Sequence, residues 1–195
     1  MKIGLFFGSF NPIHIGHLII ADYIALYTDL SEVWMVVSPH NPLKPKSSLA
    51  KDHDRLHLVK IAIEDNPGLK VSNIEFGLPK PSYTIDTLTY LREKHPEKQF
   101  CLIMGGDNLE SIHKWKNYEK LLRDYDIFVY NRKGHNDFDP TLLSRVTFVD
   151  APLIEISSTM IRNRIAEGKS VRYLVSEPVY AYLEANPLYK IVKKD

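Results

Sequence analysis

The chain has 195 residues, of which 44% are hydrophobic and 25% are charged, and both values are ordinary for a globular protein. Lysine and arginine number 25 against 24 aspartate and glutamate residues, so the formal net charge is +1. This balance does not favour a nucleic-acid partner or an anionic membrane, and any anion site must therefore be local. The length suits one α/β domain better than two.

The cellular compartment is indicated by the N-terminal segment and by cysteine usage. The apolar run 3–7 is broken by Gly8 and is too short for a signal peptide. Asp22 interrupts the apolar stretch 18–21, which leaves no segment long enough to span a bilayer. Cys101 is the only cysteine and lies in an apolar run, so we interpret it as a core residue. We expect a cytoplasmic protein without a membrane partner.

Short apolar, β-branched or aromatic runs alternate with longer helical patterns along the chain. Strands are predicted at 2–7, 33–38, 69–73, 100–104, 126–130 and 146–149. Helices are predicted at 16–27, 54–65, 85–94, 159–167 and 177–185, with a broken pair across 108–123. This alternation predicts an α/β fold, a single Rossmann-like doubly wound domain over 1–195 with a mostly parallel sheet and helices on both faces.

The loop after the first predicted strand is the first candidate for a ligand site. Ligands of open parallel sheets bind at the carboxyl ends of the strands, and here His14-Ile15-Gly16-His17 opens the following helix. Histidines three residues apart share one helix face, where free N–H groups and the helix dipole favour an anion. Gly8 would let a phosphate approach the main chain. The alternative is that one histidine caps the helix and the other is exposed.

A second candidate anion site lies at the start of the predicted helix 159–167. Ser158 is a candidate N-cap, and Arg162 lies four residues further on, on the same helix face. Hydroxyl groups, free N–H groups and a guanidinium could together bind phosphate. Taken alone, the segment is better explained by a plain N-cap and a solvated arginine. As a partner of the first loop, it would form the other half of a triphosphate site.

Three further residues each have a structural and a functional interpretation. Asp107, after Gly105-Gly106, is either an N-cap or a carboxylate that accepts ribose hydroxyls while the glycines let a nucleoside approach the main chain. Lys44, in the proline-rich loop 39–48, is either solvated or reaches a substrate phosphate. Trp115, taken alone, is more typical of a core residue than of a ligand platform.

These motifs, in this order, resemble the nucleotidyltransferase superfamily marked by an H-x-G-H loop, and within it the bacterial nicotinate-nucleotide adenylyltransferases. The resemblance covers almost the whole chain. The segments 81–88 and 105–108, together with Trp115, narrow the resemblance from the superfamily to the nicotinate-nucleotide adenylyltransferases. It implies transfer of the adenylyl group of ATP to nicotinate mononucleotide in NAD biosynthesis. It also implies that Mg²⁺ is carried with ATP and that the protein holds no metal of its own.

The resemblance implies a role for individual residues. The catalytic residues would be His14, His17 and Arg162. ATP would be bound by Gly8, Ser9, Phe10, His14, His17, Gly105, Asp107, Ser157, Ser158, Thr159 and Arg162, with the helical part at about 157–190 completing its site. The mononucleotide would be bound by Lys44, Ser82, Tyr83, Thr84, Trp115 and Arg132. The family often has Pro-Pro-His-Lys in the proline-rich loop, so His40 and Lys44 are both candidates for the acceptor phosphate.

Two alternative functions fit parts of the sequence. Another adenylyl- or cytidylyltransferase of the superfamily, with nicotinamide mononucleotide or phosphopantetheine as acceptor, would share the first loop but would leave 80–87 without a role. A non-catalytic nucleotide sensor or an RNA-binding fragment belongs to a different class, and the neutral charge argues against RNA. We expect small-molecule partners and no nucleic acid. The sequence leaves the oligomeric state open, a homo-oligomer included.

Overall fold

Six apolar runs become the strands of one parallel sheet. The computed structural model describes residues 1–39, 49–130, 143–152 and 154–190. Within them the sheet has the order β3-β2-β1-β4-β5-β6, and every neighbouring pair of strands is parallel. The strands are β1 (Lys2–Gly8), β2 (Glu32–Val37), β3 (Leu69–Ser72), β4 (Gln99–Gly105), β5 (Ile127–Tyr130) and β6 (Val146–Val149). The order reverses between β1 and β4, so the predicted Rossmann-like, doubly wound fold is confirmed.

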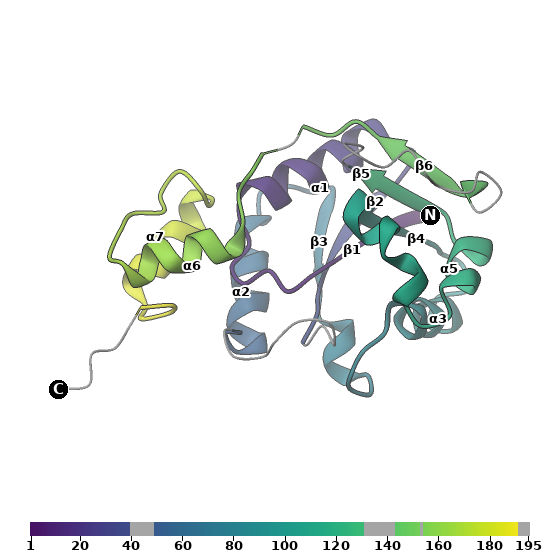
Figure 1. Ribbon diagram of the computed structural model, residues 1–195, viewed down its shortest axis with the longest axis horizontal. Helices are drawn as coiled ribbons and strands as arrows, with labels where there is room; N and C mark the ends of the chain where they lie inside the picture. Colours follow the sequence, from purple (N-terminus) through teal and green to yellow (C-terminus); the bar gives the residue numbers. More distant parts are fainter. Residues whose placement is uncertain (40–48, 131–142, 153, 191–195) are drawn as a thin grey trace.

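Helices cover both faces of this sheet (Figure 1). One face is packed by α1 (Ile15–Tyr27) and α2 (Asp52–Ala62), and the other by α3 (Thr84–Lys94) and α5 (Tyr118–Asp124). Short helical turns, η2 (Ile74–Gly77), α4 (Gly106–Glu110) and η3 (Ile112–Lys114), lie in the connections. Beyond β6, α6 (Ser158–Ala166) and α7 (Glu177–Ala185) lie together beside α1 and α2, and α7 contacts α2.

Side chains of the central strands alternate between two buried faces. In β1, Phe6 packs into the cluster formed with α1 and α2, whereas Ile3 and Leu5 pack into the cluster formed with α3 and α5. Because neither face meets solvent, the strands are continuous apolar runs in the sequence. Cys101 of β4 is fully buried, as predicted, and this burial raises the pKa of its thiol to about 12.

The predicted element boundaries differ from the structure mainly at α2. This helix was predicted at 54–65 but spans Asp52–Ala62, because Lys51 takes the N-cap position and acidic residues occupy the first turn, where they favour the helix dipole. It ends where the Ile63 N–H donates to the Lys60 carbonyl. The broken pair predicted at 108–123 is α4, η3 and α5. In the described part of the chain, no helix is long and apolar enough to cross a membrane.

Candidate active site

The loop after β1 is shaped by a buried aromatic ring. Phe10 has a positive φ of 43°, and its ring packs at 1% exposure beneath the loop. A Cβ on Gly8 would lie 2.7 Å from that ring, so Gly8 makes room for Phe10. The missing side chain of Gly8 therefore makes room for the Phe10 ring, and the approach of a phosphate to the Gly8 main chain stays a prediction.

The spacing of the H-x-G-H segment follows from a stacked pair of histidines. His14 is the N-cap of α1, and its ring stacks on that of His17 with centroids 3.6 Å apart and an interplanar angle of 25°. A Cβ on Gly16 would lie 3.2 Å from His14 Nδ1, closer than side chains normally approach. The glycine between the histidines therefore lets the His14 ring lie against the start of the helix.

The ring nitrogens of the two histidines have different surroundings. His14 is only 6% exposed, and burial lowers the pKa of its imidazole to about 4, so the ring is uncharged at neutral pH. Its Nδ1 atom is buried and faces the His17 backbone N–H across the capping box, but it makes no hydrogen bond of normal geometry with the described residues. The Nδ1 atom of His17 accepts a hydrogen bond of 3.3 Å from the His14 backbone N–H. An Nδ1 atom that accepts leaves the ring proton on Nε2, which makes His17 Nε2 a hydrogen-bond donor.

The start of α6 meets the loop after β1. Ser158 Oγ donates to the Pro12 carbonyl at 2.8 Å, and Arg162 Nη1 donates to the Asn11 carbonyl at 2.9 Å. These contacts join segments that lie 146 and 151 residues apart in the sequence. The two segments predicted to bind a triphosphate are therefore neighbours in the structure.

The N-cap of α6 is Ser157, so the assignment of Ser158 as the N-cap was wrong. Ser157 has an extended backbone, with φ of −126° and ψ of 147°, and its hydroxyl accepts from the Met160 N–H. Ser158 is already the first helical residue, which leaves its hydroxyl available for Pro12. Arg162 also donates from Nη2 to Thr159 Oγ1 at 3.2 Å. The hydroxyls and the guanidinium predicted for the phosphate site thus lie at one helix end.

A buried asparagine connects the same loop to two further parts of the chain. Asn11 is 3% exposed, and its Oδ1 accepts from the Ala50 N–H at 3.1 Å and from the Tyr189 hydroxyl at 2.8 Å. Burial raises the pKa of the Tyr189 hydroxyl above its usual range, so this group stays protonated and donates. The residues after α7 therefore help to fix the loop; the resemblance placed 157–190 at the ATP site but did not single out Tyr189.

The carboxyl end of β4 carries the predicted adenosine residues. Gly105 is the N-cap of α4, and a Cβ on it would lie 2.5 Å from Asp107 Oδ1, so the carboxylate folds back over the glycine. Asp107 is exposed. The neighbouring Tyr130 hydroxyl has its pKa raised to about 12, first by burial and then by the charge of Asp107. Because β4 pairs with β1, Asp107 and the histidine loop follow adjacent strand ends.

Three of the residues predicted to bind the mononucleotide, Ser82, Tyr83 and Thr84, lie at the start of α3. Tyr83 is the N-cap of this helix and Thr84 its first residue. Ser82 Oγ donates to Glu75 Oε2 at 3.1 Å, and Glu75, which is 2% exposed, fixes the position of the segment. Lys44 and Arg132 lie outside the described residues, as does His40.

Trp115 packs on the same side of the sheet as this segment. Trp115 and Tyr83 are both partly buried against the core cluster on the α3 face of the sheet. Lys116, the next residue, places its Nζ 4.8 Å from the centroid of the Tyr83 ring and pairs with Asp86 at 2.8 Å. Two aromatic side chains and a helix start therefore form this side of the candidate site.

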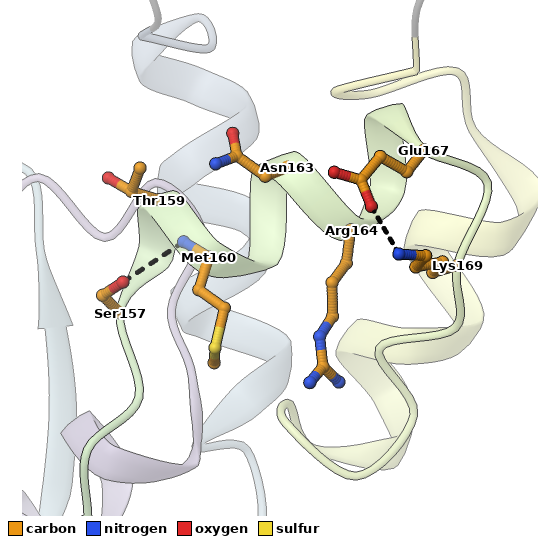
Figure 2. A pocket seen from close by; sticks show the side chains of 7 residues that line it. All are labelled: Ser157, Thr159, Met160, Asn163, Arg164, Glu167 and Lys169. Carbon is orange, nitrogen blue, oxygen red and sulfur yellow. Dashed lines mark hydrogen bonds and ion pairs between the residues drawn. The ribbon is translucent and has the colours of Figure 1, made fainter.

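A cavity of about 570 Å³ runs along α6 from the predicted phosphate site. Figure 2 shows its lining, in which Lys169 pairs with Glu167 at 2.7 Å. The lining residues are Ser157, Thr159, Met160, Asn163, Arg164, Glu167 and Lys169. Ser157 and Thr159 belong to both the cavity and the predicted ATP site. Among the described residues, no group of three or more His, Cys, Asp or Glu side chains could hold a metal ion.

Comparisons with known proteins identify the family. A family model described as cytidylyltransferase-like matches residues 5–164. A protein of Flavobacterium johnsoniae, named as a nicotinate-nucleotide adenylyltransferase, is 52% identical over 192 residues, which are 97% of this chain and 100% of that protein. The chain belongs to the nicotinate-nucleotide adenylyltransferase family. A Bacteroides fragilis member of this family is 46% identical over 179 residues, covering 92% of this chain and 89% of that protein.

A solved structure from Plasmodium falciparum has the same fold. The Plasmodium falciparum nicotinic acid mononucleotide adenylyltransferase complexed with NaAD superposes with a TM-score of 0.79 at 21% identity, covering 96% of this chain and 97% of that chain. The resemblance inferred from the sequence motifs is therefore confirmed at the level of the family and of the fold.

The side chain of Arg55, which donates to the Ser9 carbonyl in the loop after β1, was not predicted as a site residue. Arg55 of α2 has no exposed surface, although it stands in a charged segment that suggests a solvated helix start. A signal was present, because Arg55 precedes Leu58, Val59 and Ala62 at the spacing of one helix face, and all four are buried.

Proposed function

We infer that the protein transfers the adenylyl group of ATP to nicotinate mononucleotide, giving nicotinate adenine dinucleotide and pyrophosphate in NAD biosynthesis. The observation that carries this function is the junction between the loop after β1 and α6, made by Ser158 with Pro12 and by Arg162 with Asn11. It brings two helix starts, two imidazoles and a guanidinium to one sheet edge. Family membership supports the choice of acceptor.

The triphosphate would lie between the starts of α1 and α6. Free N–H groups at both helix ends favour an anion. The Nδ1 of His14 is buried against the start of α1, so His14 would donate to a phosphate oxygen from Nε2. His17 would donate from Nε2, and Arg162 and Thr159 would contact phosphate from α6. The whole chain would then act as one nucleotidyltransferase domain, with 157–190 completing the ATP site.

The remaining predicted residues would hold the nucleosides. Gly105 and Asp107 would take the adenosine, with the carboxylate accepting ribose hydroxyls. Backbone N–H groups at Tyr83 and Thr84 would pair with the nicotinate carboxylate while Trp115 contacts the ring. Nicotinamide would present its NH₂ group to these donors, and the unpaired group would cost about 1–3 kcal/mol. Lys44, Ser82 and Arg132 complete the proposed acceptor site.

The chemistry needs alignment and charge stabilisation more than proton transfer. A phosphate oxygen of the mononucleotide attacks the α-phosphorus of ATP, and the bond from that phosphorus to the pyrophosphate oxygen breaks. The attacking oxygen is already ionised at neutral pH, so no general base is required. ATP enters as its Mg²⁺ complex, and His14, His17 and Arg162 stabilise charge on the transferring group. No covalent enzyme intermediate is formed.

Pyrophosphate release with a panel of substrates tests this function. We expect release with ATP and nicotinate mononucleotide, in the cytoplasmic pH range and without RNA or lipid. Equal kcat/KM for nicotinamide mononucleotide would contradict the nicotinate assignment. Release only with phosphopantetheine, or only with CTP, would assign the protein to another activity of the superfamily. Failure to release pyrophosphate with every acceptor would show a non-catalytic nucleotide binder.

A further inference from the structure

The buried side chain of Arg55 has every donor occupied. A guanidinium carries five N–H donors in a planar fork. Nε donates to the Ala50 carbonyl at 3.2 Å, and Nη1 donates to the carbonyls of Ser38, at 2.8 Å, and Ser9. Nη2 donates to the Pro39 carbonyl at 3.4 Å and to Asp52 Oδ1 at 2.7 Å. Five acceptors on five residues therefore satisfy one fully buried cation.

The acceptors of Arg55 lie where two loops leave the sheet. Ser9 directly follows β1, and Ser38 and Pro39 directly follow β2. These strands are parallel neighbours, and the Ser38 N–H donates to the Gly8 carbonyl at 2.9 Å. The first loop leads to His14 and His17. The second leads to the segment predicted to hold the acceptor phosphate, and the chain returns to the guanidinium at Ala50.

We propose that Arg55 is a positioning residue that fixes the loop after β1 against the segment after β2, and so aligns the two substrates. This role rests on the proposed function, in which the first loop binds ATP and the second holds the acceptor. In-line transfer requires the attacking oxygen to be held opposite the pyrophosphate, and a misplacement of about 1 Å costs about 100-fold in rate. Arg55 touches neither substrate and acts through the backbone carbonyls that it joins.

The geometry explains why this position needs arginine. Four backbone carbonyl oxygens converge on the guanidinium, and they would be left unpaired and mutually repulsive without a buried donor. Lysine offers three donors without the planar fork, so it cannot satisfy all five acceptors. The carboxylate of Asp52 compensates the buried charge.

The ATP side of the site has anchors that do not involve Arg55. Ser158 with Pro12, Arg162 with Asn11, and Tyr189 with Asn11 all hold the loop after β1 from the α6 and α7 side. Loss of Arg55 should therefore displace the ends of the segment after β2, at Ser38, Pro39 and Ala50, more than the histidine loop. This asymmetry predicts that turnover falls while ATP affinity is retained.

The test compares Arg55→Lys and Arg55→Met with the wild-type protein. We expect kcat for pyrophosphate release to fall about 100-fold in both variants, while the ATP Kd, measured by titration calorimetry without acceptor, changes by less than about threefold. Leu91→Ala is the control, because Leu91 is buried at the far end of α3 and its truncation lowers stability without touching either loop. Its kcat should stay near the wild-type value at a temperature where all variants are folded by circular dichroism.

Several results would overturn the positioning role. A folded Arg55→Lys variant with wild-type kcat would do so, and this variant decides the matter if Arg55→Met does not fold. Equal losses of kcat and ATP affinity, or a kcat loss matched by Leu91→Ala, would show a general structural role instead. Absence of pyrophosphate release by the wild-type protein would overturn the proposed function as well, which separates the two failures.

Discussion

The uncharged state of His14 makes the stability of the free protein depend on pH. The pKa of this imidazole is lowered by burial from 6.5 to about 4. Between these values the unfolded chain binds a proton that the folded protein does not. The free energy of unfolding is therefore highest above pH 6.5 and decreases as the pH drops toward 4. Each pH unit in that window costs about 1.4 kcal/mol, and the whole window costs roughly 3 kcal/mol.

Urea denaturation followed by tryptophan fluorescence, at pH values from 4 to 8, measures this dependence. Many carboxylates titrate in the same range, so the informative quantity is the difference between the wild-type protein and His14→Gln. We expect this difference to shift by roughly 3 kcal/mol between pH 7 and pH 4, in the direction of a less stable wild type at low pH. His113→Gln, which changes an exposed histidine, is the control. Parallel pH profiles for the wild type and His14→Gln would refute the assignment.

Three further predictions concern the loop after β1 and the metal. Gly16→Ala places a Cβ 3.2 Å from His14 Nδ1, so steady-state kinetics should show kcat falling about tenfold, while thermal denaturation shows no loss of stability because alanine suits a helix better than glycine. An unchanged kcat would count against the stacked histidine pair as the reacting site. Tyr189→Phe removes the hydrogen bond to Asn11, and urea titration should show about 1 kcal/mol lower stability together with a raised KM for ATP. A wild-type KM for ATP would show that the residues after α7 do not affect ATP binding. Chelation of Mg²⁺ should stop turnover without lowering the Tm of the free protein, and a lower Tm would instead reveal a metal bound by the protein.

The parts of the fold that depend on local pattern could be predicted from the sequence. The strands are buried on both faces, so their runs are apolar from end to end, and the alternation with helices leaves few topologies for a parallel sheet. The His14–His17 turn was also predictable, because it opens a helix directly after the first strand. Its shape was not, since the role of Gly8 depends on where the ring of Phe10 packs.

Contacts between distant segments could not be predicted. Whether Ser157 or Ser158 caps α6 depends on Pro12, which lies 146 residues from Ser158 and accepts the hydroxyl of the second serine. Tyr189 follows the last predicted helix without any periodic signal, yet its hydroxyl meets Asn11. Arg55 lies among charged neighbours, and only its register with the buried face of α2 indicated that it is internal. Long-range hydrogen bonds decide each of these positions.

The His14–His17 turn and the start of α6 are expected to bind one triphosphate between them. A crystal structure of the protein with Mg²⁺ and a non-hydrolysable ATP analogue tests this expectation most directly. The phosphates are expected within hydrogen-bond distance of both His17 Nε2 and the Arg162 guanidinium. A triphosphate bound elsewhere, for example along the cavity near Arg164 and Lys169 and away from His17, would contradict it.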